Sequence, residues 1–234
     1  MENCRILVWD LPLRVYHWSL AVSFAGAFLT AEAERYRDAH VLLGYTVLAL
    51  LAFRLLWAFA GTRYARLSSF AFGPGAVVRY LKSLADGRPS RYVGHNPAGS
   101  WVIYALIVLG VAAGLAGHAI GAGGGGGEWM EDIHEGLANV MLALVVVHVG
   151  GVVASSFLHR ENLVRAMLTG YKSGAPGEGI ARTRRAVAIA LVLGLISLWT
   201  VVLPVTTAET AMHRAGGGEH HERSRGHASH SHRS

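Results

Sequence analysis

The sequence contains little cysteine and little charge. Cys4 is its single cysteine, which excludes an internal disulfide and a metal site made of several thiolates. We expect Cys4 to be a solvated thiol without a role. Asp, Glu, Lys and Arg make up 15% of the residues, against about 25% in a typical soluble domain, and hydrophobic residues make up 52%. This composition predicts an integral membrane protein.

The positive charge of the chain is spread between its apolar runs. The formal net charge is +6, which taken alone would suit a protein that binds nucleic acid. No segment combines basic and aromatic residues in a binding surface, so we expect no nucleic-acid partner. We interpret the basic residues as signals that orient the chain in a membrane.

Five apolar runs approach the roughly 20 residues that a helix needs to cross a bilayer. Residues that favour helix starts precede three of the runs, namely Asp10, Asp38 and Asn96. The sequence "AEA" at Ala31 to Ala33 resembles a signal-peptide cleavage site, but polar residues early in the first run favour a retained helix. The runs extend from Leu13 to Ala31, Ala39 to Ala60, Gly99 to Ile120, Gly136 to Leu158 and Ala186 to Val205.

The loops between the runs differ in basic charge. Residues 61–97 and 159–185 each contain six Lys or Arg residues, whereas residues 32–38 contain two and residues 121–133 contain none. Because cytoplasmic loops are rich in Lys and Arg, the N-terminus is predicted to be cytoplasmic and the C-terminus periplasmic. Four arginines after Thr206 oppose this orientation weakly, since the rule is strongest for short loops.

The first basic loop contains an amphipathic segment, "PGAVVRYLKSLADG", at residues 74–87. Helical spacing puts Val77, Leu81 and Leu84 on one face, and Arg79 and Lys82 elsewhere. We therefore predict a short helix on the inner membrane surface.

Four histidines lie within or beside the apolar runs. Fourteen residues separate His134 from His148, close to four helical turns and a rise of about 21 Å, so the two share one face at opposite sides of the membrane. His17 begins an outward-running helix, and His40 begins an inward-running one. Depth alone therefore pairs His17 with His148 near the inner side, and His40 with His134 near the outer side.

Two opposed imidazoles from neighbouring helices are the ligands that a six-coordinate haem iron needs. Arg54 follows His40 by fourteen residues, at the predicted depth of the inner pair, where a guanidinium could bind a haem propionate. Extension of Arg54 to the inner interface is an equal alternative. Small residues would let a flat macrocycle approach the backbone, although they also serve tight helix packing. The candidates are Gly26, Gly44, Gly136, Gly150 and Gly151.

Several motifs, taken together, are specific enough to indicate a protein family. They are "VWDLPLRVYHW", "HVLLGY" with "FRLLW", "GHNPAG", and "HEGLANVMLALVVVH" with "SSFLHRENLVRAMLTG". Over about residues 7 to 172 the chain resembles the bacterial diheme cytochrome b561 family, related to the b-type cytochrome subunits of nickel-iron hydrogenase and formate dehydrogenase. The resemblance implies two haems b in a four-helix core, with His17 and His148 as axial ligands of the inner haem, and His40 and His134 of the outer one. The chain has no Cys-x-x-Cys-His motif, so the haems would be held non-covalently.

Three further histidines lie outside this ligand set. His118 stands near the outer end of the third run, where the family would have a Thr-Gly, and is an alternative ligand of the outer haem. His159 is a weaker alternative at the inner end, since neighbouring Arg160 suggests the headgroup level. We expect His95 to be a capping or packing residue of the inner loop.

The chain divides into three parts. Residues 1–172 form the predicted diheme transmembrane domain, and residues 173–205 an inner linker and a fifth transmembrane helix. Residues 206–234 contain six histidines among Gly, Ser and Arg, a composition that predicts disorder and could bind metal loosely. The glycine-rich stretch at residues 121–128 is expected to be a flexible outer loop.

The predicted fold is therefore an all-α integral membrane protein, with a four-helix bundle holding two haems b and a fifth C-terminal helix. We expect an electron-transfer cytochrome of the bacterial inner membrane that links the quinone pool to a periplasmic c-type cytochrome, dehydrogenase or hydrogenase. No catalytic residue is expected, because two histidines on each iron leave no open position. By resemblance, quinone binds beside the inner haem, near His17, His148 and Arg54. Two alternatives remain: a superoxide oxidase that donates electrons to ubiquinone, and a haem-free metal-ion transporter.

Overall fold

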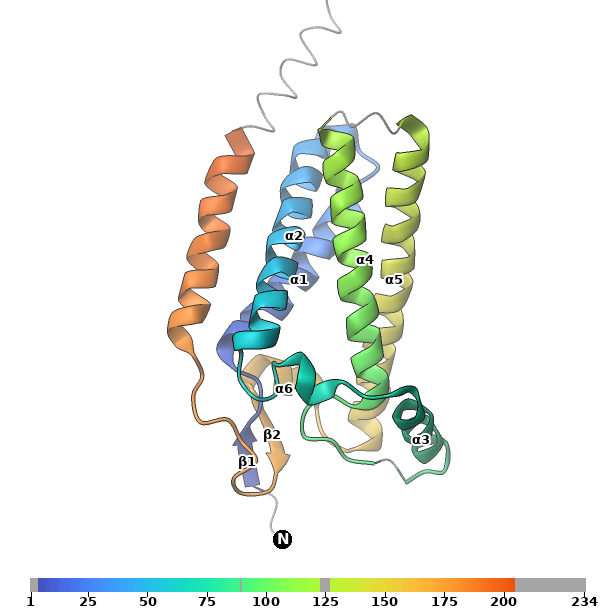
Figure 1. The fold of residues 1–234 in the computed structure, drawn as a ribbon, viewed down its shortest axis with the longest axis vertical. Coiled ribbons are helices and arrows are strands. Elements are labelled where there is room, and N and C mark those ends of the chain that lie inside the picture. Colours follow the sequence, from blue (N-terminus) through green and yellow to red (C-terminus); the bar gives the residue numbers. More distant parts are fainter. Residues whose placement is uncertain (1–3, 89, 123–126, 205–234) are drawn as a thin grey trace, which may run out of the picture.

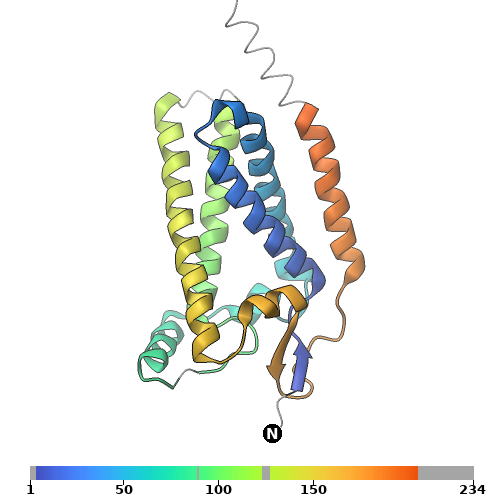
Figure 2. The same cartoon turned by 180° about the vertical axis from the view of Figure 1, so that it is seen from behind.

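The computed structural model describes residues 4–88, 90–122 and 127–204 of the chain. The long helices are α1 (Leu11–Thr30), α2 (Arg37–Ala60), α4 (Pro97–Gly121), α5 (Gly127–Leu158) and a C-terminal helix, Arg185–Pro204. They run along one common direction, and α1 lies obliquely across its neighbours (Figures 1 and 2). The C-terminal helix flanks α1 and α2 on the side of the bundle away from α5 (Figure 1).

Four helices among the described residues are long and apolar enough to cross a membrane. They are Glu34–Ala60, Pro97–Gly121, Gly127–Leu158 and Arg185–Pro204, which correspond to the second to fifth predicted runs. The chain is thus an all-α protein, apart from one short ribbon, with four candidate membrane spans. Helix α1 has 20 residues but is not among the four. Its first turns contain Arg14, Tyr16 and His17, which lower its hydropathy, so its crossing of the membrane stays a prediction.

Helix α5 is longer than the sequence suggested. It begins at Gly127 rather than at Gly136, and it includes the exposed residues Glu128, Glu131 and Asp132. The assignment of these acidic residues to an outer loop was therefore wrong. Carboxylates are favourable near a helix N-terminus, where the backbone dipole is positive, and hydropathy does not report this effect. Most of the predicted glycine-rich loop, residues 123–126, lies outside the described residues.

Two of the three predicted helix starts are confirmed. The Asp10 side chain caps α1 by accepting a hydrogen bond of 2.9 Å from the Leu13 backbone amide. Asn96 caps α4 by accepting one of 2.7 Å from the Gly99 amide. Asp38 does not cap α2, because that helix begins at Arg37 and Asp38 falls within its first turn.

The end of the bundle that the sequence predicts to be cytoplasmic, and that is called the inner end for this reason, contains elements that the sequence did not predict. Strands β1 (Cys4–Leu7) and β2 (Tyr171–Gly174) form an antiparallel ribbon. The ribbon brings together the two ends of the segment, about residues 7 to 172, that carries the family resemblance. The short helix α6 (Leu163–Thr169) precedes β2. Cys4 is exposed at the edge of the ribbon, as expected for a solvated thiol. Both strands have four residues, too few for a periodic signal.

The predicted amphipathic helix is confirmed as α3 (Pro74–Ala85), which follows the 3₁₀ turn η2 (Leu67–Phe70). Helix α3 lies beside the lower ends of α4 and α5 (Figure 1). Its buried residue is Tyr80, while Val77 and Leu84 are half-buried and Leu81 is exposed. The predicted apolar face therefore covers the protein only in part.

Asp10 holds the inner ends of α1 and α2 together. The carboxylate is fully buried and accepts hydrogen bonds from Trp57 Nε1 at 3.1 Å and from Thr62 Oγ1 at 2.6 Å, besides the capping bond. Trp57 belongs to the last turn of α2, and Thr62 follows that helix. A buried carboxylate is stable only when its oxygens accept such bonds, so Asp10 fixes how the two helices meet.

We expect Asp10→Ala to lower the free energy of unfolding by about 2 to 4 kcal/mol, because it removes a cap and leaves two buried donors without an acceptor. Asn96→Ala is the matched control, since Asn96 caps a helix without the two side-chain bonds from distant residues, and it should cost only about 1 kcal/mol. Thermal unfolding of the purified proteins in detergent measures the difference. Equal losses would show that the bonds to Trp57 and Thr62 do not stabilise the fold.

Candidate functional site

The structure brings the four predicted histidines together in two pairs. His17 on α1 and His148 on α5 have ring centroids 6.4 Å apart. His40 on α2 and His134 on α5 have ring centroids 6.0 Å apart. Two imidazoles that each hold one metal ion through a nitrogen at about 2 Å have centroids roughly 6 Å apart. Both separations therefore suit two axial ligands of one iron.

The outer pair is held in the tautomer that a metal ligand needs. The Nδ1 atom of His40 lies 2.9 Å from the Ala27 carbonyl oxygen on α1, and that of His134 lies 2.9 Å from the Ala113 carbonyl oxygen on α4. A carbonyl oxygen only accepts, so each Nδ1 must donate its hydrogen. The Nε2 atom of each ring then keeps a free lone pair, as in most metal-bound histidines.

The inner pair has a different surrounding. Nδ1 of His17 is buried and has no hydrogen-bond partner among the described residues. The His17 ring also contacts the indole of Trp18 edge-on, with centroids 5.3 Å apart. A buried imidazole nitrogen without a partner is costly in a protein interior, and this one lacks the carbonyl acceptor that each ring of the outer pair has.

The candidate glycines differ in the space beside them. A Cβ atom on Gly26 would lie 2.8 Å from a Leu43 methyl group, so this glycine serves helix packing. Beside Gly117 the His134 ring approaches so closely that a Cβ atom would lie 3.0 Å from its Cε1. The remaining candidates have no described atom within 4 Å of such a Cβ, which leaves room for a flat group against the backbone. They are Gly44, Gly136, Gly150 and Gly151.

Arg54 is a buried cation without an ion pair. The residue is only 2% exposed, so its guanidinium lies within the protein. Nη1 donates to the Ala65 carbonyl oxygen at 3.0 Å, and the guanidinium lies 5.6 Å from the centre of the Phe70 ring. Within the described part of the chain no carboxylate lies at ion-pair distance from it. The remaining donors of the guanidinium suit an anionic group such as a propionate.

The two alternative ligands are not part of either pair. His118 Nδ1 lies 2.9 Å from the hydroxyl of Tyr45, at the outer end of α4. This hydrogen bond gives His118 a partner other than His40 and His134. His159 lies in the turn after α5. Among the described residues it makes no ring contact with His17 or His148.

His95 packs as a neutral histidine at the inner end. Its ring lies 4.7 Å from that of Trp9 and 4.5 Å from that of Phe70, between centroids, and its Nδ1 has no partner in the described part of the chain. The packing role is therefore confirmed, whereas the capping role belongs to Asn96. Burial, together with the nearby charge of Arg54, lowers the pKa of His95 to about 3.

The lowered pKa of His95 predicts a loss of stability in acid. The folded protein keeps His95 neutral, whereas the unfolded chain takes up a proton below pH 6.5. The contribution of neutral His95 to the free energy of unfolding is complete above pH 6.5 and is lost as the pH falls toward 3. The free energy of unfolding of the wild type should therefore fall by roughly 2 to 3 kcal/mol between pH 7 and pH 4.5. His95→Phe keeps an aromatic ring but no titrating group. Thermal unfolding at pH 7 and at pH 4.5 should show a smaller loss of stability in acid for this variant than for the wild type. Equal losses would contradict the prediction.

Comparison with known proteins identifies the family. The sequence profile of prokaryotic cytochrome b561 matches residues 8–170. The chain belongs to this family. Three relatives of this cytochrome b561 are named probable Ni/Fe-hydrogenase B-type cytochrome subunits. The one from Rhodobacter capsulatus is 23% identical, over 74% of this chain and 83% of the relative. Those from Azotobacter vinelandii and Cupriavidus necator are 27% and 28% identical, over 73% and 71% of this chain and 90% and 86% of the relatives. No solved structure matches significantly.

The protein is thus a membrane b-type cytochrome of the b561 family, related to hydrogenase cytochrome subunits. Membership implies haem b and electron transport. The residues described above fit that group: paired imidazoles at ligand separation, open space beside four glycines, and a buried guanidinium without an ion pair.

Sequence reasoning on this cytochrome b561 missed the residues that orient the site. Gly117 was not among the candidate glycines, although it is the one that contacts an axial-ligand candidate. Lys172 on β2 was counted only as a basic loop residue, yet it is buried and donates to the carbonyl oxygens of Tyr92 and Val93 at 3.2 and 2.9 Å. These bonds fix the loop that leads to His95. A lysine between a short strand and a distant loop leaves no pattern in the sequence.

Proposed function

We propose that this cytochrome moves electrons between the membrane quinone pool and a periplasmic redox partner through two bis-histidine haems b. The observation that supports it most directly is the presence of two histidine pairs at ligand separation, one towards each end of the bundle. In this proposal His17 and His148 hold the inner haem, and His40 and His134 hold the outer one. When bound, each haem supplies one-electron redox chemistry.

The protein side chains orient and tune the two irons. The carbonyl oxygens of Ala27 and Ala113 fix the rings of the outer pair, and the guanidinium of Arg54, which donates to the Ala65 carbonyl oxygen, would hold a propionate of the inner haem. Two histidines on each iron would leave no open coordination position, so outer-sphere electron transfer would be favoured over ligand chemistry at iron. Among the described residues no cluster of three or more His, Cys, Asp or Glu could hold a bare metal ion, as a transporter site would need.

We further propose five membrane crossings, with the N-terminus in the cytoplasm and the C-terminal helix ending at the periplasmic side. Helix α1 lies obliquely across the other long helices and runs from one end of the bundle towards the other, which supports its crossing (Figure 2). Both loops with six basic residues lie at the end of the bundle that carries α3, α6 and the ribbon (Figure 1). Basic loops at one end are typical of the cytoplasmic side.

The test of the proposed function is the redox spectrum of the purified protein. We expect two haems b per chain by pyridine haemochrome assay, and reduction of both by a short-chain quinol. The relatives are named as hydrogenase subunits, so a hydrogenase or a c-type cytochrome is the proposed class of outer partner. A protein that bound one haem, or none, would contradict the two-haem arrangement. A protein with two haems that quinol did not reduce would contradict the link to the quinone pool.

Transfer to a basic partner should slow as salt is added. Glu128, Glu131 and Asp132 are exposed at the outer end of α5, and screening weakens their attraction for a positively charged partner. Stopped-flow oxidation of the reduced protein by a basic c-type cytochrome measures the rate. We expect the rate to fall several-fold between low and physiological ionic strength. The triple variant Glu128→Gln, Glu131→Gln, Asp132→Asn should lose most of the dependence on ionic strength. Asp86→Asn, at the opposite end of the bundle, should keep it. Salt-independent transfer by wild type would exclude electrostatic docking here.

A further inference from the structure

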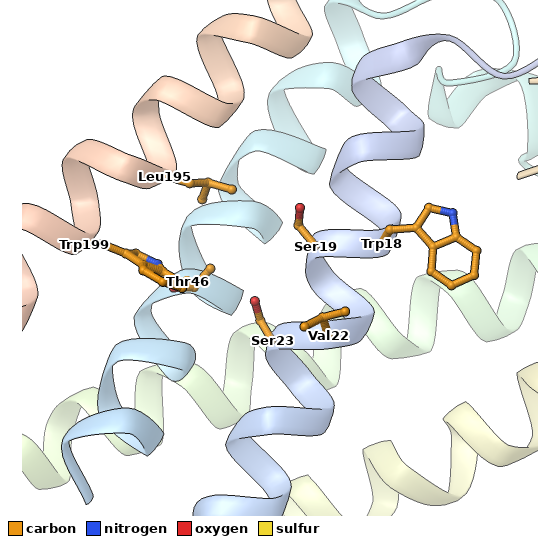
Figure 3. A pocket seen from close by; sticks show the side chains of 7 residues that line it. All are labelled: Trp18, Ser19, Val22, Ser23, Thr46, Leu195 and Trp199. Carbon is orange, nitrogen blue, oxygen red and sulfur yellow. The ribbon is translucent and has the colours of Figure 1, made fainter. Parts of the chain in front are cut away.

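Two open cavities lie end to end along α1. The first has a volume of about 370 Å³ and lies between α1, α2 and the C-terminal helix. Figure 3 shows Ser19 on α1, with Leu195 and Trp199 of the C-terminal helix across from it. The second has a volume of about 300 Å³, lies between α1 and α6, and shares Trp18 and Ser19 with the first. Together they form one groove along residues 11–23, which we call the α1 groove.

The α1 groove has the direction and length of a lipid chain. It begins in the first turn of α1, at the inner end, and follows the helix towards the middle of the bundle. Nine residues separate Arg14 from Ser23, a rise of about 14 Å. One leaflet of a hydrocarbon core about 30 Å thick spans about 15 Å. Exposed apolar side chains, among them Val22 and Leu168, line the groove, so one acyl chain can lie along it.

A cation stands at the inner end of the groove. Arg14 lines the second cavity, and its Nη1 donates to the Thr169 carbonyl oxygen at 3.0 Å, which holds the guanidinium beside the cavity. Its Nε is buried and has no hydrogen-bond partner in the described part of the chain. No carboxylate among the described residues lies at ion-pair distance from Arg14. A guanidinium with unused donors at the membrane interface suits a phosphate group.

The linker before the C-terminal helix adds positive charge at the same place. The Leu11 amide, at the start of the groove, donates to the Thr183 carbonyl oxygen at 3.0 Å. This bond brings the flanking residues Arg182 and Arg184 beside the inner end of the groove. Both arginines are exposed, and neither makes an ion pair within the described ranges. Glu178 is the nearest acidic residue in the sequence, and its carboxylate accepts a backbone hydrogen bond of 2.8 Å. The inner end of the groove is therefore cationic.

We propose that the α1 groove binds one anionic phospholipid. Its phosphate group contacts Arg14, with Arg182 and Arg184 beside it, and one acyl chain lies along the groove towards Ser23. A zwitterionic lipid carries a cation in its headgroup, which these arginines repel, so an anionic lipid is preferred. The C-terminal helix, one wall of the groove, lies beyond the matched family region, residues 8–170. The inference uses the proposed crossing of α1 but neither the haems nor the quinone link.

The test is native mass spectrometry of the full-length protein, titrated with dioleoyl phosphatidylglycerol or with dioleoyl phosphatidylcholine, which has the same chains. We expect one tightly bound phosphatidylglycerol per chain, with an affinity about tenfold higher than that of phosphatidylcholine. The variant R182Q/R184Q should bind phosphatidylglycerol about tenfold more weakly, because two cations near the phosphate are lost. The matched control is R79Q/K82Q, which removes two exposed cations from α3 at the same end of the bundle and should leave the affinity unchanged.

A second measurement locates the acyl chain and does not depend on a variant. Phosphatidylglycerol with a diazirine in the middle of one chain is bound to the full-length protein and activated by light. Peptide mass spectrometry should find the label on α1 between Trp18 and Ser23, or on the C-terminal helix between Leu195 and Trp199, since these segments line the deeper cavity. Unlabelled phosphatidylglycerol should compete for this position.

Equal affinities for the two lipids would overturn the proposal. An equal loss of affinity in R79Q/K82Q would overturn it too, because binding would then follow the total charge of the inner end, and so would a label found only outside the two lining segments. The measured mass also counts the haems, so failure of this site is distinct from failure of the proposed function. Selective lipid binding by a chain with fewer than two haems would support this site and contradict the two-haem arrangement. Two haems without selective lipid binding would contradict this site alone.

Discussion

Alanine in place of His17 or His148 should remove one and the same haem, and alanine in place of His40 or His134 should remove the other. Each iron in the proposed arrangement has two axial ligands, and the ring centroids of these pairs are 6.4 and 6.0 Å apart. Haem content should therefore fall from two to one per chain in all four variants. Redox titration of the remaining b-type absorbance should give one midpoint potential for the first pair of variants and a different one for the second.

The matched controls for these variants are His118→Ala and His159→Ala, which should keep both haems. His118 has the Tyr45 hydroxyl as its partner, and His159 contacts neither pair among the described residues. Two results would contradict the arrangement. A His40 variant with the same residual potential as the His148 variant would overturn the pairing by depth. A His134 variant that retained both haems would transfer the ligand role to His118.

The histidine pairs could be predicted from the sequence because a bilayer restricts the helices that span it to a few simple arrangements. A helix that spans a bilayer crosses it once, and consecutive spanning helices alternate in direction, so helical rise predicts depth from position along the chain. His17 and His148 lie far apart in sequence but share one depth, and the structure brings their rings together. The long spans themselves were predicted for the same reason, since the bilayer fixes their length and composition.

The structure at the inner end of the protein could not be predicted in this way. The ribbon pairs Cys4 with Gly174, and Lys172 donates to the carbonyl oxygens of Tyr92 and Val93, across separations that no local pattern encodes. Asp10 gave a helix-start signal, but the signal did not reveal that the same carboxylate also binds Trp57 and Thr62. Outside the apolar spans, tertiary contacts between distant residues decide the structure, and a single sequence does not report them.

A bulky side chain at Gly117 should remove the outer haem. A Cβ atom at this position would lie 3.0 Å from Cε1 and 3.2 Å from Nδ1 of His134. The hydrogen bond of 2.9 Å from Nδ1 to the Ala113 carbonyl oxygen, one turn earlier on the same helix, holds the ring against Gly117, so the ring cannot move away without losing that bond. Gly117→Ala should therefore disturb the ring, and Gly117→Val should displace it.

Loss of the bond that orients a ligating histidine typically weakens metal binding about 10- to 100-fold. We therefore expect Gly117→Val to be purified with the inner haem alone, and Gly117→Ala to retain an outer haem with a shifted midpoint potential. Gly121→Val is the matched control, because the same helix ends there and a Cβ atom meets no described atom within 4 Å. Haem content and redox titration distinguish the variants. Two haems with unchanged potentials in Gly117→Val would show that the position of the His134 ring does not depend on this glycine, and would remove the steric argument for the orientation of the outer ligand.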